Sequence, residues 1–374
     1  MRIVFLSHTS RQSVFRVGSH HLAREFSRLG HHVAHISNPI SVAHLARFTD
    51  PEVRARARRS LPLRLQCIDG AHFVVPWSVF PLAPDPLAHP LTLGSTRMLR
   101  KSLIAAGFDR PELMFVDQPL LDYLIEPLDP QTVIYRPTDI VAGKLAQTAQ
   151  LRVLRRSAGV VATSAVVAAQ LPEVHPRKPS VVVENGVDTE HFVPSSIPWS
   201  ARSGAVYVGA LDARFDWTTV DAIGQAHPSQ RVDLYGPVAQ SPPRLPPNVT
   251  LRGAVPYEDL PSILRTYRIG LLPMNHDPAN DGRSPMKLFE YLASGLSVVA
   301  RKTSALSAHE LADLHMYGTS ETAPNVFGTA LTVAATPAGV AAANEMGWTA
   351  RANRVLSAAE EMREQAPRTI GRIR

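Results

Sequence analysis

The stretch Gly282–Ala300, "GRSPMKLFEYLASGLSVVA", carries the signals of a helix that leads into a buried strand. Ser284 belongs to the residue types preferred at a helix N-cap, and Pro285 suits the first helical position, where no N–H is needed. Gly295 predicts the C-cap, and the run Ser297–Ala300 with its two valines is typical of a buried parallel strand. The stretch therefore predicts one helix–strand unit of a parallel α/β sheet.

Lys287 lies at about the third position of this helix, where the helix dipole is unfavourable to a cation. A lysine there is explained if an anion binds at that end, because helix N-termini attract phosphates through free N–H groups and the dipole. The spacing also places Met286 and Glu290 on one face, with Lys287 three residues from Glu290. Two interpretations remain: a phosphate-facing helix, or an ordinary capped helix with a solvated Lys–Glu pair.

Length and composition restrict the class of protein. A chain of 374 residues exceeds one typical core, so two domains are expected. The single cysteine, Cys67, excludes an internal disulfide framework and suits a reducing compartment. No stretch approaches the about 20 apolar residues of a membrane span, and the start "MRIVFLSHTS" predicts a strand rather than a signal peptide. We therefore expect a cytoplasmic protein.

The net charge of +7 is unevenly distributed. Residues 1–184 hold 22 Lys and Arg against 14 Asp and Glu, whereas residues 185–374 hold 17 against 18. Such basic character suits an anionic membrane surface, nucleic acid or a phosphorylated ligand, or is only a solvated helix face. No nucleic-acid module is recognisable, so we expect the inner face of the cell membrane as a partner. The densest cations are Arg54, Arg56, Arg58, Arg59, Arg97, Arg100 and Lys101.

Apolar runs alternate with amphipathic segments along both halves of the chain. In the first half, strands are expected at 2–7, 31–37, 72–77, 112–118, 132–139, 159–162 and 180–188, with a helix at 20–30 and irregular structure through most of 39–90. In the second half, strands are expected at 204–211, 231–237, 249–255 and 269–274, with helices at 257–267 and 345–362. The pattern predicts an α/β fold with parallel sheets.

The segment "NGVDTEHFVPSSIPWS" has the composition of a linker between two domains. We expect an N-terminal Rossmann-like domain at 1–187, a C-terminal Rossmann-like domain at 188–345, and a last helix at 346–374 that packs back on the first domain. Two doubly wound domains that face each other would bring the carboxyl ends of their strands to one cleft, where ligands bind in such sheets.

Several motifs together resemble the two-Rossmann (GT-B) nucleotide-sugar glycosyltransferases, in particular the glucuronosyltransferase of the xanthan pathway and the teichuronic-acid-type transferases. The motifs are "IYRPTD" (134–139), "ENGVD" (184–188), "VGALDARFDW" (208–217), "LYGP" (234–237) and "SPMKLFEYLASGLSVVA" (284–300). The resemblance covers most of residues 1–310 and is densest in the second domain.

The resemblance implies a role for individual residues. Asp139 matches the aspartate that acts as catalytic base, and Met286 and Lys287 match a pair that contacts the nucleotide diphosphate. Glu290 matches the second acid of the Glu-x7-Glu pattern of the retaining enzymes, which usually contacts the ribose. The first acid of that pattern is replaced by Gly282, so inversion is favoured over retention.

Further residues complete the expected site. Donor contacts are also expected at Gly209, Tyr235, Gly236, Arg283 and Ser284, and acceptor contacts at Arg16 and His20, near His8 and His21. Asp139 has the alternative of capping the helix after its strand, and each histidine the alternative of an ordinary surface position. No Asp-x-Asp pair is present, so no metal is expected, and no cofactor besides the UDP-sugar substrate.

The resemblance thus implies an inverting glycosyltransferase, with Asp139 as base, that moves a sugar from a UDP-sugar to a lipid-linked or polysaccharide acceptor. Glucuronate is the first donor expectation, and a hexose is the second. Alternatives are a retaining glycosyltransferase, a UDP-sugar epimerase, or a sugar-nucleotide-binding protein without catalytic activity.

Overall fold

The computed structural model describes residues 1–47, 50–60, 63–78, 89–239 and 242–366. The chain divides into two compact units, Met1–Glu184 with Ala352–Arg374, and Asn185–Arg351. The division falls three residues before the expected boundary after 187. Val187 belongs to the second unit because its N–H donates to the carbonyl of Met346 and its carbonyl accepts from the N–H of Trp348.

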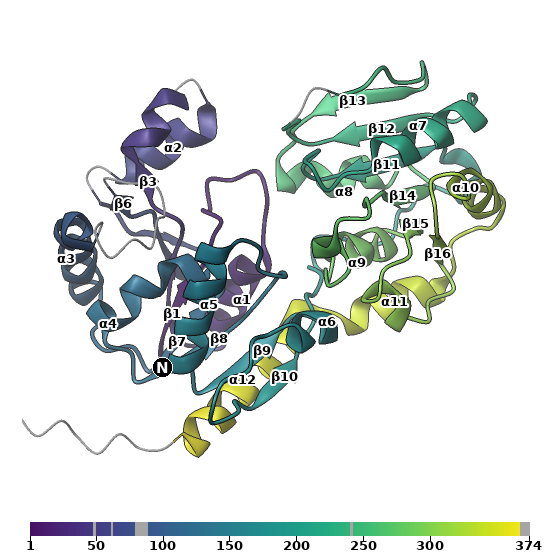
Figure 1. The fold of residues 1–374 in the computed structure, drawn as a ribbon. Helices are drawn as coiled ribbons and strands as arrows, with labels where there is room; N and C mark the ends of the chain where they lie inside the picture. The colour runs from purple at the N-terminus through teal and green to yellow at the C-terminus, as the bar shows by residue number, and fades with distance from the viewer. Residues whose placement is uncertain (48–49, 61–62, 79–88, 240–241, 367–374) are drawn as a thin grey trace, which may run out of the picture. The chain divides into compact units, whose positions relative to one another are not determined.

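The first unit contains an eight-stranded sheet in the order β10-β9-β8-β7-β1-β2-β5-β4 (Figure 1). Neighbouring strands are parallel except β4, which pairs antiparallel with β5 at the edge. A separate pair consists of β3 (Ile40–Ser41) and β6 (Trp77–Ser78). The eight strands are β1 (Arg2–Leu6), β2 (His32–Ile36), β4 (Gln66–Ile68), β5 (Ala71–Val74), β7 (Leu113–Val116), β8 (Thr132–Tyr135), β9 (Gly159–Ala162) and β10 (Ser180–Val182).

Helices cover both faces of this sheet because alternate strand residues point to opposite sides. Val4 and Leu6 pack with residues of α3 to α6, whereas Phe5 stacks on Phe115 and on Phe26 of α1. The helices are α1 (Gly18–Arg28), α2 (Pro51–Ser60), α3 (His89–Ala105), α4 (Ile125–Leu128), α5 (Lys144–Arg156), α6 (Ala165–Ala169) and α12 (Trp348–Gln365), with 3-10 turns at Val42–Arg47 and Pro119–Leu124.

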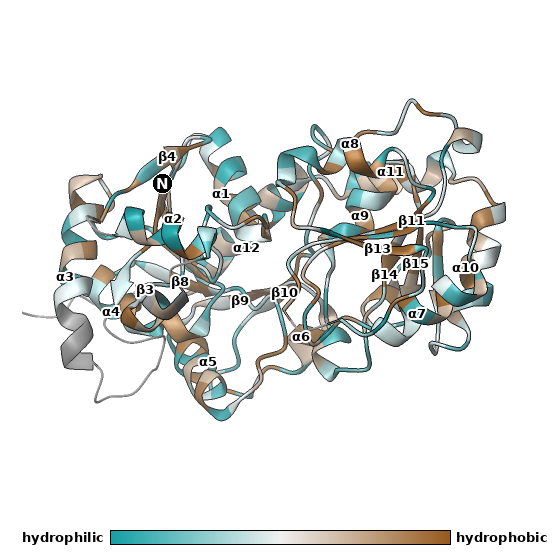
Figure 2. Ribbon diagram, turned by 90° about the horizontal axis from the view of Figure 1, so that it is seen from above, coloured by the Kyte–Doolittle hydropathy of each residue, from teal (hydrophilic) through white to brown (hydrophobic). Residues whose placement is uncertain are grey.

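The second unit contains six parallel strands in the order β13-β12-β11-β14-β15-β16. Figure 2 shows hydrophobic colour along its central strands, as expected for strands buried on both faces. The predicted strand after Gly295 is confirmed, and all of its residues are buried. The strands are β11 (Ala205–Val208), β12 (Val232–Tyr235), β13 (Val249–Gly253), β14 (Ile269–Leu272), β15 (Ser297–Arg301) and β16 (Leu314–Tyr317).

One face of the second sheet is covered by α8, α9 and α11, and the other by α7 and α10. The helices are α7 (Trp217–Ala226), α8 (Leu260–Leu264), α9 (Met286–Ala293), α10 (Ala323–Thr332) and α11 (Pro337–Glu345), with 3-10 turns at Trp199–Ala201, Tyr257–Asp259, Pro278–Asn280 and Leu306–Ala308. In the described ranges, no single helix is long and apolar enough to cross a membrane; α10 and α11 pass that test only as a pair bent by 108°.

Residues 39–90 were expected to be mostly irregular, and this prediction is wrong for the described part. The segment contains α2 and the strands β3 to β6, and α3 begins at its end. The prolines and arginines concealed these elements, because α2 buries only Val53 and Ser60 and therefore lacks a continuous apolar stripe. Residues 79–88 lie outside the described residues.

The last helix begins at Trp348, because α11 occupies the chain to Glu345 and Gly347 then forms a bridge with Val187. From Ala352 onward this helix belongs to the first unit. Met362 lies so close to Gly159 of β9 that a Cβ at that glycine would collide with the methionine side chain. This contact corresponds to the expected packing of the tail on the first domain.

Candidate functional site

The second sheet changes direction at β11, whose neighbours β12 and β14 lie on opposite sides. Connections from such strands leave toward opposite faces and open a crevice at their carboxyl ends. Gly209 follows β11 with φ +155°, and Gly236 follows β12 with φ +150°. A Cβ at Gly236 would overlap the carbonyl oxygen of Gly209. Glycine is thus required at both predicted positions, because the backbone has positive φ there and a Cβ would meet neighbouring atoms.

Lys287, at the start of α9, brings a cation to this crevice. A Cβ placed on Gly209 would lie 2.5 Å from Cε and 2.9 Å from Nζ of Lys287. Nζ also lies 5.9 Å from the ring centroid of Tyr207. Burial lowers the pKa of Lys287 to about 8, and the nearby charge of Arg283 acts in the same direction. The structure therefore brings Lys287 and Gly209 together, with Arg283 within electrostatic range; the donor role expected of all three stays a prediction.

Two residues of the loop after β11 were not predicted as part of the site. Arg214 also contributes to the lowered pKa of Lys287, so it lies within electrostatic range of the ammonium. Nη2 of Arg214 lies 2.7 Å from Oδ2 of Asp212. Burial alone would raise the pKa of Asp212, but hydrogen bonds from Arg214 and the charge of Arg283 lower it. Both residues lie in the motif at 208–217. These two charges could have indicated from the sequence that the residues belong to the site.

Glu290 lies one turn along α9 from Lys287 and is only 7% exposed. Burial raises the pKa of its carboxyl group; Lys287 opposes this shift and Asp188 adds to it. Among the described residues, no side chain donates a hydrogen bond to this carboxylate. A buried carboxylate of this kind can accept hydrogen bonds from hydroxyl groups of a ligand.

The start of α9 corrects two predictions. Pro285 is the N-cap residue with ψ 115°, and the helix begins at Met286, so Ser284 is not the cap. Ser284 instead accepts a hydrogen bond on Oγ from the N–H of Asn185, and its carbonyl accepts one from the Asn185 side chain. Lys287 thereby becomes the second helical residue.

The C-terminus of α9 differs by one position from the prediction. Ser294 is the C-cap, and Gly295 follows it with φ +73°. Leu296 N–H donates to the Tyr291 carbonyl, and Gly295 N–H donates to the Leu292 carbonyl, which is the hydrogen-bond pattern of a Schellman motif. Glycine is needed here because the backbone is left-handed.

Tyr235 and Met286 are the remaining expected donor contacts. The ring of Tyr235 packs against the core beneath α8 and α9, and its hydroxyl lies 3.4 Å from that of Tyr267. Tyr267 in turn donates to Asp233 at 2.6 Å. Met286 is half-buried as the first residue of α9. The donor roles of both residues stay predictions.

In the first unit, acids follow two neighbouring strands at the carboxyl edge of the sheet. Asp117 follows β7 and forms a fully buried ion pair with Arg136, which follows β8, at 2.8 Å. Burial raises the pKa of Asp117 against the opposing charges of Arg136 and His8. Asp139 is half-exposed three residues after Arg136. The buried pair, which was not predicted, anchors the segment that presents Asp139.

The expected acceptor residues lie in and after the loop that follows β1. His20 is 4% exposed; its Nε2 bonds the carbonyl of Thr9, and its Nδ1 accepts from the N–H of Val17. Burial keeps the pKa of His20 well below its usual value, so the ring is neutral. Arg16 donates to the carbonyls of Arg11 and Ser13. Both side chains hold the loop at 9–17, and their contact with an acceptor stays a prediction.

Similarity to known proteins agrees with these features. Residues 217–322 match the family described as glycosyl transferase-like. The putative teichuronic acid biosynthesis glycosyltransferase TuaH of Bacillus subtilis is 27% identical over 180 residues, which cover 44% of this chain and 45% of that protein. The matched region thus covers less than half of the length of this curated relative.

Solved structures with the same fold cover nearly the whole chain. Sucrose-phosphate synthase from Thermosynechococcus elongatus superposes with a TM-score of 0.69 at 15% identity, over 98% of this chain and 100% of that one. The Anabaena protein Alr3699/HepE, solved with UDP and glucose, has a TM-score of 0.67 at 14% identity, over 96% and 100%. The chain has the GT-B fold. The predicted two-Rossmann architecture and the resemblance to GT-B glycosyltransferases are thereby confirmed.

Proposed function

We propose that this GT-B protein is a glycosyltransferase that moves a sugar from a UDP-sugar to a lipid-linked or polysaccharide acceptor. The observation that carries the proposal is Lys287 beside Gly209 at the switch point of the second sheet, with Arg283 and Arg214 within electrostatic range of its ammonium. Three cations and the N-terminus of α9 suit a diphosphate. The solved complexes of the Anabaena protein with UDP and UDP-glucose support a uridine donor.

In this proposal the second unit stabilises the leaving group. As the bond between the anomeric carbon and the phosphate oxygen breaks, negative charge grows on the diphosphate, and Lys287 and the arginines stabilise that charge. Glu290 accepts hydrogen bonds from the ribose hydroxyls, a role for which its buried carboxyl group near the start of α9 is suited. We propose that no metal is required, because the side-chain cations take its place. Turnover should therefore persist in the presence of a metal chelator.

Asp139 is the proposed general base of an inverting transfer. Its carboxylate removes the proton from the acceptor hydroxyl, whose oxygen forms the new bond to the anomeric carbon as UDP departs. The half-exposed position at the carboxyl edge of the first sheet supports this role over Asp117, which is only 5% exposed. The glycine at position 282 supports inversion over retention.

Calorimetry with UDP and a panel of UDP-sugars tests the proposal directly. UDP should bind the full chain with micromolar affinity, and UDP-sugar should be consumed only when an acceptor is present. Glucuronate is the proposed sugar, with hexoses as the comparison in the panel. Consumption of UDP-sugar without an acceptor would instead establish an epimerase or hydrolase, and absence of any UDP binding would overturn the donor site.

We also propose that the first unit binds the anionic inner surface of the cell membrane. On α3, the cations Arg97, Arg100 and Lys101 are exposed together with Met98, which is 56% exposed, and Ile104. On α2, Arg54 and Arg58 are exposed, whereas Arg56 donates to the carbonyl of Asn38 and is not available. Exposed cations beside exposed apolar groups favour an anionic lipid surface.

Co-sedimentation with vesicles of mixed neutral and anionic lipids tests the membrane proposal. Binding should fall as salt rises, because each exposed cation near the surface contributes about 1 kcal/mol. Replacing Arg97, Arg100 and Lys101 by Gln should weaken it strongly, whereas the pair Arg177→Gln and Lys178→Gln serves as the control. Binding that is indifferent to lipid charge would rule the proposal out.

A further inference from the structure

Arg301 is a buried arginine at the carboxyl end of β15 in the second unit, and it is only 8% exposed. Within the described ranges its guanidinium makes one hydrogen bond, in which Nη1 donates to Nδ1 of His276 at 2.9 Å. A histidine contributes no negative charge that could balance the arginine. Nε of Arg301 is buried and has no partner. Buried charges are normally paired with an opposite charge, so the surroundings of Arg301 lack an anion.

One acid, Asp281, lies within electrostatic range of Arg301, but other donors engage it. Its Oδ1 accepts from the N–H of Ser304 at 2.9 Å, and its Oδ2 accepts from Oγ of Ser304 at 2.6 Å. These two bonds lower the pKa of Asp281 more than the charge of Arg301 does. In the part of the chain that the structure describes, no carboxylate forms an ion pair with Arg301.

Tyr317 adds a second unpaired group on the same side of the sheet. Arg301 and Tyr317 occupy paired positions on the parallel strands β15 and β16, so their side chains leave the sheet on the same face. Oη of Tyr317 is buried and makes no hydrogen bond of normal geometry among the described residues, although the side chain of Thr219 is close by. Burial raises the pKa of Tyr317, and the charge of Arg301 opposes that shift. Two buried donors without partners within electrostatic range of each other suit a ligand that accepts hydrogen bonds.

The loop between β14 and α9 connects Arg301 to the proposed donor site. The loop carries His276, which bonds Arg301, and Arg283, which lies shortly before the start of α9. Within the same loop, the carbonyl of Asp281 accepts from the N–H of Ala305, which follows β15. Arg301 therefore lies at the same edge of the sheet as the groups proposed to bind the diphosphate.

The sheet order sets the distance between Arg301 and the diphosphate. Gly209 follows β11, and Arg301 ends β15, two strands away in the order β11-β14-β15. With neighbouring strands about 4.8 Å apart, the two strand ends are separated by roughly 10 Å along the edge. A diphosphate with one attached sugar ring has a comparable length. A negative charge on that ring can therefore reach Arg301 while the diphosphate lies beside Gly209.

We propose that Arg301 binds a carboxylate on the sugar ring of the donor, so that the enzyme selects a UDP-uronate over a neutral UDP-hexose. The inference rests on the proposed function, because it requires a UDP-sugar at this edge. A carboxylate accepts paired hydrogen bonds from the Nε and Nη2 edge of an arginine. His276 occupies Nη1, on the other side of the guanidinium, and leaves that edge available.

A neutral hexose carries a hydroxymethyl group where a uronate carries its carboxylate. That group has no charge, so the buried guanidinium of Arg301 would stay without an anion when a hexose binds. The expected preference for the acidic sugar is at least about tenfold, which corresponds to one hydrogen bond between charged groups.

Calorimetry on the full chain compares two acidic donors with their neutral counterparts, UDP-glucuronate with UDP-glucose and UDP-galacturonate with UDP-galactose. Each pair has the same ring hydroxyl configuration, so its members differ only in the group at C6. The native chain should bind at least one acidic donor about tenfold more tightly than its neutral counterpart. In Arg301→Gln this preference should disappear, while the affinity for UDP itself stays the same.

Two further variants keep the test decisive. Arg231→Gln is the matched control, because Arg231 is an exposed arginine that precedes β12 at the opposite edge of the same sheet, and it should keep the full preference. Arg301→Lys keeps the charge but loses the paired donors, so the preference should shrink without disappearing. If Arg301→Gln does not fold, an unchanged preference in folded Arg301→Lys would still overturn the inference.

The outcomes separate this inference from the proposed function. A native chain that binds UDP but prefers neither acidic donor would refute the role of Arg301 and leave a hexosyl donor in place. A folded Arg301→Gln protein that binds UDP and all four sugars equally weakly would show that Arg301 only supports the structure. If the native chain binds neither UDP nor any UDP-sugar, the donor site and this inference fall together.

Discussion

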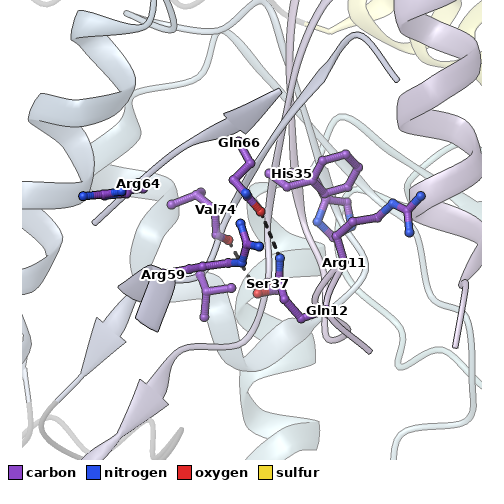
Figure 3. A pocket seen from close by; sticks show the side chains of 10 residues that line it. Arg11, Gln12, His35, Ser37, Arg59, Arg64, Gln66 and Val74 are labelled. Carbon is purple, nitrogen blue, oxygen red and sulfur yellow. Dashed lines mark hydrogen bonds between the residues drawn. The ribbon is translucent and has the colours of Figure 1, made fainter. Parts of the chain in front are cut away.

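The Asn185–Arg351 unit and the first unit differ in how they build a binding edge. In the second unit six parallel strands alternate with helices, and the crevice depends on two glycines and the start of α9. In the first unit the sheet ends in the antiparallel pair β4–β5, and side chains from the loop after β1, α2 and β2 line a small hollow (Figure 3). The donor edge is thus made mainly by backbone geometry, and the acceptor edge by side chains brought together from distant segments.

This difference indicates which of the two edges determines substrate specificity. A nucleotide diphosphate is the same chemical object in many donors, and backbone N–H groups with a few cations suffice to bind it. Acceptors vary, so the residues that select them vary with loops and insertions. In this chain the cationic surplus lies in residues 1–184, with 22 Lys and Arg against 14 Asp and Glu, in the unit proposed to bind the acceptor.

Among variants that test the difference between the two edges, Asp139→Asn is expected to have the largest effect on turnover. The amide keeps the shape but cannot accept a proton, so turnover should fall roughly 10²–10⁴-fold, about 3–5 kcal/mol of barrier. UDP affinity by calorimetry should stay unchanged, because the donor lies on the other unit. Asp129→Asn is the control, since Asp129 is exposed and pairs with the exposed Arg110. Near-normal turnover in Asp139→Asn would remove the base, and a product with retained anomeric configuration would remove inversion.

Lys287→Ala should weaken UDP binding by roughly 1.5–3 kcal/mol, the range for a hydrogen bond to a charged group. Calorimetry measures this directly, with Lys178→Ala in the first unit as the matched control. A folded Lys287→Ala protein with unchanged UDP affinity would contradict the donor site.

Gly209→Ala tests whether the donor edge depends on backbone approach. The added Cβ would lie 2.5 Å from Cε of Lys287 and 2.8 Å from the hydroxyl of Tyr207, so the ammonium must move and UDP affinity should fall about tenfold, or 1.4 kcal/mol. Gly253→Ala is the control, because Gly253 has φ +76° but open space around its Cβ. Both variants should lose about 1–3 kcal/mol of stability through strain. Equal UDP affinities would show that close approach at Gly209 does not matter.

The smallest effect is a pH dependence of UDP binding. The pKa of Lys287 is lowered to about 8 in the free protein, and a bound diphosphate would raise it again. Below pH 8 the ammonium is already charged and Lys287 makes its full contribution to the affinity; above pH 8 a proton must be taken up, so this contribution falls by at most tenfold per pH unit. Phosphate ionises near pH 6 and does not contribute in this window. Calorimetry from pH 7 to 9.5 should show the decline in the native chain and not in Lys287→Ala.

Much of the second unit could be predicted from the sequence. The strand after Gly295, the glycines at 209 and 236, and the position of Lys287 follow from local rules about left-handed backbone, buried β-branched runs and helix termini. The helix start was displaced by one residue, because Ser284 bonds Asn185, which is 99 positions away in the sequence. A local capping rule cannot include such a partner.

The sequence by itself determined the two-domain α/β architecture, because apolar periodicity and glycine positions are local properties of the chain, and its motifs carried the resemblance to GT-B enzymes. Only the tertiary structure decided which charges meet. It pairs Asp117 with Arg136, brings Arg214 toward Lys287, and gathers Arg11, Arg59 and His35 around one pocket. Their separations along the chain carry no local signal. Electrostatic partners depend on distance in space, which is set by the order of strands in the sheets and the paths of the loops that join them.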